Sequence, residues 1–197
     1  MAATSVAILA RAPVPGFAKT RLVPAIGAHA AAVLQERLTA QAVAAALAAK
    51  VGPVTLWCTP DLTHRSFRDL GVALKRQPEG DLGARMLACF EGKPTLVIGA
   101  DCPCLTPAHL RDAAQALVAH DVVLIPAEDG GYVLVGAKAA HPGLFEAMTW
   151  SVPAVLAETR KRIAALGLSA AELPALWDVD TEDDLARMER EFPELAL

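Results

Sequence analysis

Short apolar runs alternate along the chain with longer segments in which apolar residues recur at helical spacing. The run 95–99, TLVIG, carries no charge and is the most convincing buried strand, whereas the long, alanine-rich segment 27–50 carries Leu34 and Leu38. Because strands that alternate with helices are typical of an α/β sheet, we expect that fold class. The predicted strands are 5–10, 54–58, 72–76, 95–99, 122–125 and 132–135. The predicted helices are 27–50, a short one that ends at 67–70, three that begin after Asp81, Thr106 and Thr181, and 153–166.

Three of these helices begin with a recognisable N-cap. Asp81, Thr106 and Thr181 each precede a helical pattern, and their side-chain oxygens can accept hydrogen bonds from the first turn. Thr181 and Asp184 also have the spacing of a capping box. The helix after Asp81 is expected to carry Leu82, Met86, Leu87 and Phe90 on one face, and the helix after Thr106 to turn Leu110, Ala113, Ala114, Leu117 and Val118 inward.

Size and composition narrow the possible classes. The chain has 197 residues, which suits a single domain, 1–197, and its 54% hydrophobic and 20% charged residues are not those of a disordered protein. A formal net charge of −4 without any basic run argues against a nucleic-acid partner. The longest segment free of Asp, Glu, Lys and Arg, 22–35, is shorter than the roughly 20 residues of a membrane span. Since the start of the chain is also a poor signal peptide, we expect a cytoplasmic protein with reduced cysteines.

Three cations gather in the segment that follows the first predicted strand. Arg11, Lys19 and Arg21 lie in a stretch that two prolines and Gly16 keep out of helix or strand. Ligands of open α/β sheets bind at the carboxyl ends of strands, and arginine and lysine suit phosphate oxygens. We therefore expect a phosphate-binding loop here, although a proline-rich surface loop with solvated charges fits the same pattern. The spacing is not that of a Walker loop or of a dinucleotide fingerprint.

Three aspartates are not fully explained by helix caps. Asp101 directly follows the strand 95–99, where a carboxylate is well placed to hold Mg²⁺ together with substrate phosphates. Asp178 and Asp180 precede the cap at Thr181. Because side chains two residues apart in an extended segment lie on the same side, both could reach a metal shared with Asp101. A solvated acidic loop is the alternative for this late pair.

A turn between two predicted strands carries a further pair of carboxylates. Glu128 and Asp129 precede Gly130, Gly131 and Tyr132. The glycines are common in hairpin turns, whereas two adjacent acids at a sheet edge can receive sugar hydroxyls or the proton of an acceptor. We expect this turn to bind the acceptor or sugar, and a plain hairpin with its acids in water is the alternative.

Five stretches of the chain, taken in order and spacing, resemble the bacterial rSAM/selenodomain-associated transferase family, a GT-A-fold group often labelled glycosyltransferase. They are ILARAPVPGFAKTRL, GDLGARM, IGADCPCLTPAHL, PAEDGGYVLVG and DVDTEDDL, and together they cover nearly the whole chain. More distantly, the basic loop and the aspartate after the strand resemble 2-phospho-L-lactate guanylyltransferase and molybdenum cofactor guanylyltransferase. The last stretch resembles the closing motif of sugar-activating cytidylyltransferases. Cys104 stands where such proteins usually carry glycine.

The resemblance implies a three-layer α/β/α nucleotide-diphospho-sugar transferase fold, GT-A, with a mostly parallel mixed sheet. It also implies that Asp101 and Asp180 hold Mg²⁺ or Mn²⁺ on the nucleotide phosphates. Lys19, with Arg11 and Arg21 in support, would be the basic residue of the first loop. Lys19 and Asp101 are therefore the expected catalytic residues.

The expected function is a divalent-metal-dependent transferase that uses a nucleoside triphosphate or a nucleotide sugar, together with an acceptor that the sequence does not identify. Attack at the α-phosphate would be nucleotidyl transfer, and attack at a sugar carbon would be glycosyl transfer. The alternative is a nucleotide-binding regulatory module on the same fold without turnover. A third hypothesis is thiol redox or soft-metal chemistry at Cys102 and Cys104. The oligomeric state stays open.

Overall fold

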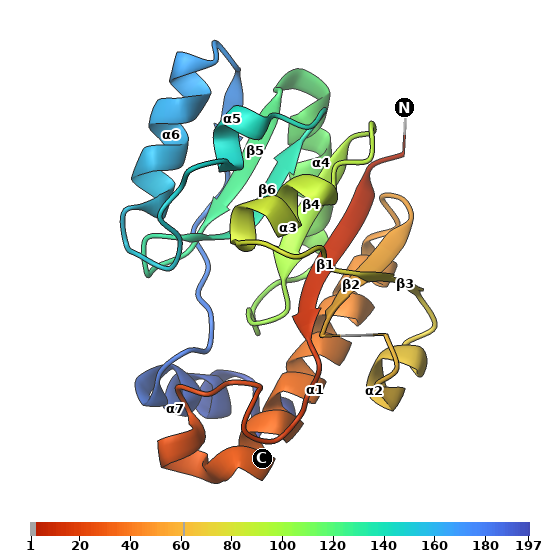
Figure 1. The fold of residues 1–197 in the computed structure, drawn as a ribbon, viewed down its shortest axis with the longest axis vertical. Helices are drawn as coiled ribbons and strands as arrows, with labels where there is room; N and C mark the ends of the chain where they lie inside the picture. Colours follow the sequence, from red (N-terminus) through yellow and green to blue (C-terminus); the bar gives the residue numbers. More distant parts are fainter. Residues whose placement is uncertain (1–2, 61) are drawn as a thin grey trace.

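In the computed structural model, which describes residues 3–60 and 62–197, seven strands form one sheet in the order β3–β2–β1–β4–β6–β5–β7 (Figure 1). The strands are β1 (Ser5–Arg11), β2 (Val54–Thr59), β3 (Ala73–Arg76), β4 (Thr95–Gly99), β5 (Val122–Pro126), β6 (Tyr132–Ala137) and β7 (Ala170–Glu172). The helices are α1 (Val23–Ala49), α2 (Arg65–Arg68), α3 (Leu82–Ala88), α4 (Pro107–Ala119), α5 (Pro142–Phe145), α6 (Val155–Ala165) and α7 (Glu182–Glu191), followed by a 3₁₀ turn, η1 (Pro193–Leu195). The mostly parallel mixed sheet predicted above is confirmed, and α5, β7 and η1 are additions to the predicted elements.

The antiparallel strand β6 brings the turn before it to the edge of the sheet at which the parallel strands end. β3, β2, β1 and β4 run parallel, and β6 is inserted antiparallel between β4 and β5. Ile98 near the end of β4 pairs with Leu134 near the start of β6. The turn before β6 therefore returns to the edge at which β1 and β4 end, and that edge carries Arg11 and Asp101.

Helices cover both faces of the sheet and complete the three layers that were predicted. α1 and α4 pack on one face, where Val43 and Leu110 join Ile8 and Ile98 in one apolar cluster. α3, α5 and α6 cover the other face, where Phe90 and other residues of this layer pack on the strands (Figure 1). Burial of these apolar side chains is the main stabilising contribution to such a fold.

A third apolar cluster joins the two ends of the chain. Leu22, just before α1, and Leu38, in the middle of α1, pack against Val179 and Leu185 from the α7 region. In Figure 1 the chain after β7 runs from the α6 side of the molecule down to α7, which lies beside the first part of α1. This crossing brings residues 178–180 to the carboxyl edge of the sheet.

Two residues expected on the apolar faces of helices are exposed. Val118 is 54% exposed, because the buried stripe of α4 is the narrow series Leu110, Ala113 and Leu117, and Val118 lies one position beyond it. Leu82 is 40% exposed because it begins α3 at a cavity instead of in the core. The first helix also starts earlier than expected, at Val23, and is kinked at Gly27.

Across the described residues, none of the helices combines the length and the apolar character that crossing a bilayer requires.

Candidate functional site

Lys19 lies at the centre of the site. Its Nζ is 2.6 Å from Oδ1 of Asp101 and 3.5 Å from Oδ1 of Asp180, and it donates a hydrogen bond of 2.7 Å to the carbonyl of Val179. The side chain is only 4% exposed. Lys19 itself has a left-handed backbone, φ 46°, which is uncommon for a residue other than glycine and is typical of functional loops. The loop thus holds one ammonium against two separate acidic segments.

The charge of Lys19 is stabilised by its neighbours. Burial alone would lower the pKa of this amine, but the contact with Asp101 and the nearby charge of Asp180 outweigh that effect and raise the pKa above its ordinary value. Lys19 therefore stays a cation at any physiological pH.

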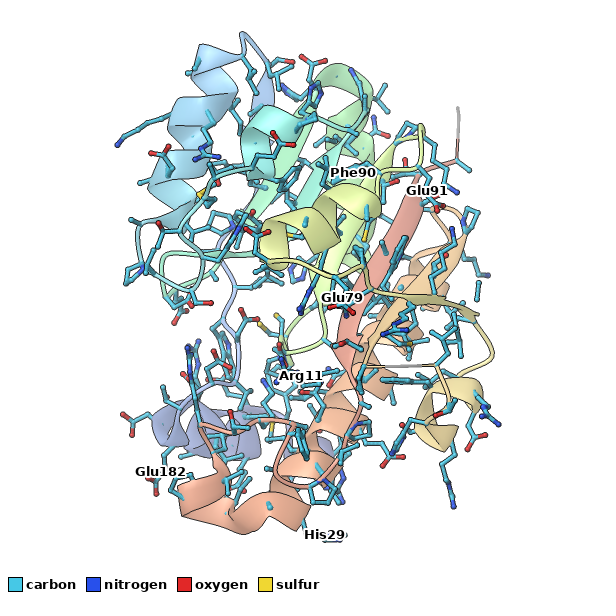
Figure 2. The ribbon with its side chains drawn as sticks, in the orientation of Figure 1. Arg11, His29, Glu79, Phe90, Glu91 and Glu182 are labelled. Carbon is cyan, nitrogen blue, oxygen red and sulfur yellow. The ribbon has the colours of Figure 1, made fainter. Side chains whose placement is uncertain are left out.

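Two arginines flank Lys19 at the same edge. Arg21 donates from Nη1 to Oδ2 of Asp180 over 2.9 Å, and Arg11 donates from Nη1 to the carbonyl of Phe17 over 3.1 Å. Figure 2 shows Arg11 near the middle of the molecule where β1 ends, whereas Glu182 lies at the far side on α7. Gly16, with φ 83°, turns the loop but does not line the cavity described next.

A cavity of about 650 Å³ opens beside these cations. Its walls come from the end of β1, the loop into α1, the residue after β4, the segment before α7, the start of β6 and the loop before α6. The predicted site residues that line it are Arg11, Lys19, Arg21, Asp101, Asp129, Gly131, Tyr132, Asp178 and Asp180. The fold therefore brings most of the predicted residues to one place.

Two residues of the predicted acceptor turn lie outside this cavity. Glu128 pairs instead with Nη1 of Arg187 on α7 at 2.9 Å. Gly130 packs so tightly that a side chain there would collide with the carbonyl of Pro153. Gly130 thus anchors the loop before α6, and the cavity wall on this side is formed by Asp129, Gly131 and Tyr132.

The carboxylates of the cavity suit a hard divalent cation. Asp101 and Asp180 are each 43% exposed, and Oδ2 of Asp101 makes no hydrogen bond or ion pair in the part of the chain that the structure describes. Burial and the charge of Asp101 raise the pKa of Asp178 to about 7. Burial is the larger cause of this pKa shift, and the neighbouring carboxylates add to it although Lys19 opposes it. Oxygen donors are the ligands that Mg²⁺ and Mn²⁺ prefer.

The described residues contain no group of three or more His, Cys, Asp or Glu side chains arranged to hold a metal. A protein contribution of one or two carboxylates, completed by phosphates and water, is nevertheless usual for Mg²⁺. The residues present therefore fit a metal that binds together with a nucleotide better than a metal held by the protein alone.

Two cysteines lie just after Asp101. The Sγ atoms of Cys102 and Cys104 are 3.5 Å apart, and both residues are free thiols. A hydrogen bond from Cys102 lowers the pKa of Cys104 to about 7, although burial opposes the shift. Neither residue lines the cavity, and two thiolates without further ligands do not complete a soft-metal site.

Sequence reasoning missed the loop before α6. Trp150, Ser151, Val152 and Pro153 line the cavity, and the indole Nε1 of Trp150 is buried without a hydrogen-bond partner among the described residues. The predicted helix 153–166 includes part of this loop, whereas α6 starts only at Val155. Trp150, three residues before Pro153 and outside any apolar run, was the available signal in the sequence.

A second cavity, of about 310 Å³, continues the first under α3. Six residues line both cavities: Leu9, Arg11, Leu82, Asp101, Tyr132 and Asp178. The ends of β1, β2 and β4 form one side of the second cavity, and α3 forms the other. Among the residues that line the second cavity but not the first, none was predicted from the sequence to be a site residue.

Comparison with known proteins finds a family model and solved structures that match the chain. The family model DUF2064, described as an uncharacterized protein conserved in bacteria, matches residues 40–152. No curated protein matches the chain.

Three solved structures share the fold over nearly the whole chain. A protein from Desulfovibrio desulfuricans G20, provisionally described as a nucleotide-diphospho-sugar transferase, has a TM-score of 0.88 and 25% identity over 97% of this chain and 88% of its own. A nucleotidyl transferase from Methanothermobacter thermautotrophicus has a TM-score of 0.67 and 16% identity over 98% and 99% of the two chains. CMP:2-keto-3-deoxy-manno-octonic acid synthetase in complex with CTP has a TM-score of 0.56 and 13% identity over 97% and 99%.

Proposed function

The chain belongs to the DUF2064 family, and we propose that it is a transferase that binds a nucleoside triphosphate or a nucleotide sugar and passes part of it to an acceptor. One observation carries the proposal. The buried ammonium of Lys19 is fixed between Asp101 and Asp180 on the wall of a cavity that also holds Arg11 and Arg21. The fold shared with a nucleotidyl transferase and with a CTP-bound synthetase supports a nucleotide as the ligand.

The three cations would hold the phosphates. Lys19 offers a permanent point charge, while Arg11 and Arg21 offer planar forks that suit two phosphate oxygens at once. Because Lys19 is positioned before any ligand arrives, its own side chain needs no further ordering to stabilise the charge that develops on the phosphates.

Asp101 and Asp180 would hold Mg²⁺ or Mn²⁺, with Asp178 nearby. When bound, such a metal neutralises phosphate charge and polarises the phosphate oxygens. Lys19 would keep the two carboxylates in place, since it contacts both of them. The carbonyl of Asp101 also accepts a hydrogen bond from the backbone of Val179, which fixes the late acidic segment against β4.

The opposite wall would receive the acceptor. Asp129 accepts a hydrogen bond of 2.9 Å from the backbone N–H of Gly131 through Oδ1, which fixes the orientation of its carboxylate. We propose that this carboxylate orients an acceptor hydroxyl and takes its proton. Trp150 and Tyr132, on the same wall, provide apolar surface against which a sugar or another small acceptor can pack.

Product analysis tests the proposal and separates its two forms. The protein is incubated with Mg²⁺ or Mn²⁺, a panel of nucleoside triphosphates and nucleotide sugars, and candidate acceptor hydroxyl compounds. Release of pyrophosphate indicates nucleotidyl transfer, which the Lys-Thr-Arg-Leu loop at residues 19–22 favours. Release of a nucleoside diphosphate indicates glycosyl transfer, which the resemblance to the rSAM/selenodomain-associated transferases favours. Nucleotide binding without any product would instead support the regulatory module.

Replacement of Lys19 tests its role directly. Lys19→Ala should weaken nucleotide binding at least tenfold, about 1.4 kcal/mol, because it removes the fixed cation and leaves two carboxylates that repel phosphate. Isothermal titration calorimetry measures the affinity. Lys93→Ala, at an exposed lysine outside the cavity, is the matched control and should leave the affinity unchanged. Equal affinities of the Lys19→Ala and control proteins would refute the assignment.

A further inference from the structure

Arg85 is a cation whose side chain has no hydrogen-bond or ion-pair partner in residues 3–60 and 62–197. It lies on α3, and its side chain is partly buried. Its Nε atom is buried and unpaired. This buried donor costs free energy and shows that packing, not hydrogen bonding, holds the side chain. Among the guanidinium atoms only Nε is both buried and without a partner in the described part of the chain, so the Nη atoms are the donors left to meet a ligand in the cavity that Arg85 lines.

The surroundings of Arg85 are not those of a phosphate site. The guanidinium lines the second cavity, whose walls include the apolar side chains of Leu9, Leu82, Met86 and Val97. Of the three cations assigned to the phosphates, Lys19 and Arg21 line the first cavity alone, and only Arg11 also reaches this one. A largely apolar cleft with a few fixed polar groups is typical of a site for a flat heterocycle.

Gln77 supplies a second fixed polar group in the same cavity. Its Nε2 donates hydrogen bonds to the carbonyls of Ala10 and Trp57, at 3.1 and 2.8 Å. Both amide hydrogens are therefore engaged, and Oε1, which has no hydrogen-bond partner among the described residues, is the atom of this amide left to meet a ligand. The cavity thus combines the donor fork of Arg85 with one oriented acceptor.

The second cavity also continues the first. Arg11 and Asp101 belong to the walls of both, so a ligand with its phosphates at Lys19 would have its base under α3. This placement rests on the function proposed above.

We infer that the second cavity binds the base of the nucleotide, and that Arg85 selects bases with two adjacent acceptors on one edge. Guanine presents O6 and N7 in this way, and cytosine presents O2 and N3. Both bases also carry an N–H donor that Oε1 of Gln77 can accept. In adenine the amino group, a donor, lies next to N1 and N7, so no two acceptors are adjacent there. In uracil an N–H separates the two carbonyls. Neither base therefore offers two adjacent acceptors to the two N–H groups of the guanidinium.

Binding measurements on the whole protein test the inference. The affinities of GTP, CTP, ATP, UTP and inorganic tripolyphosphate are measured by calorimetry in the presence of Mg²⁺, for the wild type and for Arg85→Lys and Arg85→Gln. The wild type should bind GTP or CTP at least tenfold more tightly than ATP and UTP. Both variants should lose most of that preference. Lysine keeps the positive charge but not the two parallel N–H donors of the guanidinium, and glutamine keeps neither the charge nor that pair of donors.

The pattern across ligands separates the possible roles of Arg85. In both variants the affinities for ATP, UTP and tripolyphosphate should change less than threefold. Comparison of the GTP and CTP affinities of the wild type identifies the preferred base. Arg111→Lys, at an exposed arginine of α4 outside both cavities, is the control and should change no affinity. Thermal melts by circular dichroism check that each variant is folded.

Three results would overturn the inference. A wild type that binds nucleotides with equal affinity for all four bases would contradict it while leaving the proposed function intact. An equal loss for every nucleotide and for tripolyphosphate in Arg85→Lys would make Arg85 a phosphate ligand. A wild type that binds no nucleotide at all would refute the proposed function, and the inference would fall with it.

Discussion

At the scale of single residues, Gly136 in β6 is packed so closely that there is no space for a side chain. A Cβ atom on Gly136 would lie 2.6 Å from Cδ2 of Leu96 and 2.7 Å from Cγ1 of Val123. Gly136→Ala should therefore lower the free energy of unfolding by about 1–3 kcal/mol, since extra volume in a packed core forces neighbours to move. Urea denaturation measures the change. Gly99→Ala is the matched control on β4, where the new Cβ would meet no atom closer than 4.0 Å, and an equal loss there would contradict the steric explanation.

Cys104 should be the most reactive of the four thiols. The hydrogen bond from Cys102 lowers the pKa of Cys104 to about 7, whereas burial raises the pKa of Cys89 to about 12. Because the thiolate is the nucleophile, alkylation of Cys104 by iodoacetamide should accelerate as the pH rises through 7 and level off above it. Mass spectrometry of peptides after brief labelling at pH 6, 7 and 8 follows the reaction. Labelling of Cys89 ahead of Cys104 would be the opposite result.

Single residues also show where prediction from sequence stops. Lys19 and Asp101 could be predicted because each follows a strand end, a position that depends on local sequence. Glu128 and Asp129 look alike in sequence, yet Arg187, far along the chain, holds Glu128 away from the cavity. Arg85 was missed because its significance lies in the partners it lacks. Such information exists only once the chain is folded.

Helix caps are the elements that sequence predicts best, because their hydrogen bonds are local. At α7 the capping box is formed as predicted, with Thr181 Oγ1 accepting from the backbone of Asp184 and the Asp184 carboxylate accepting from the backbone of Thr181. β7 could not be predicted, since its Ala-Ala-Glu sequence has no strand pattern. It exists because Val122 and Val123 offer it a parallel partner.

The cap at Thr181 gives a prediction at this scale. Thr181→Ala should reduce the free energy of unfolding by about 1 kcal/mol, since backbone N–H groups at the start of α7 lose their acceptor. Thermal or urea unfolding provides the value. Thr149→Ala is the comparison, because Thr149 is exposed and caps no helix, and its effect should stay within about 0.5 kcal/mol. Equal effects of the two changes would argue against the cap as a source of stability.

On the scale of the whole molecule, ligand binding should be visible as heat resistance. A nucleotide with Mg²⁺ at about 100 times its dissociation constant should stabilise the native state by about 2.7 kcal/mol. For a chain of 197 residues this corresponds to a rise in Tm of about 5–11 °C. Differential scanning fluorimetry detects such a shift. In Lys19→Ala, with affinity at least tenfold weaker, about half of the rise or more should disappear at the same nucleotide concentration, whereas a full rise there would show that the ligand binds elsewhere.

The overall architecture was only partly contained in the sequence pattern. Alternating strands and helices predict an α/β sheet, but they do not give the order in which the strands lie side by side. Nothing local in residues 132–137 announces that β6 runs against its neighbours. Its direction follows from the short connection after β5, which leaves no room for a crossover helix.

Because residues 178–180 complete the site at the sheet edge, the site can form only late during translation of the chain. The ribosome makes a chain from its N-terminus, so Asp101 and Lys19 emerge long before Asp180 and Val179, which complete their surroundings. A nascent chain can pair its strands while its ligand pocket still lacks one side. Competence to bind would then arrive late in translation, and a product cut short after β7 would be folded in part but inert.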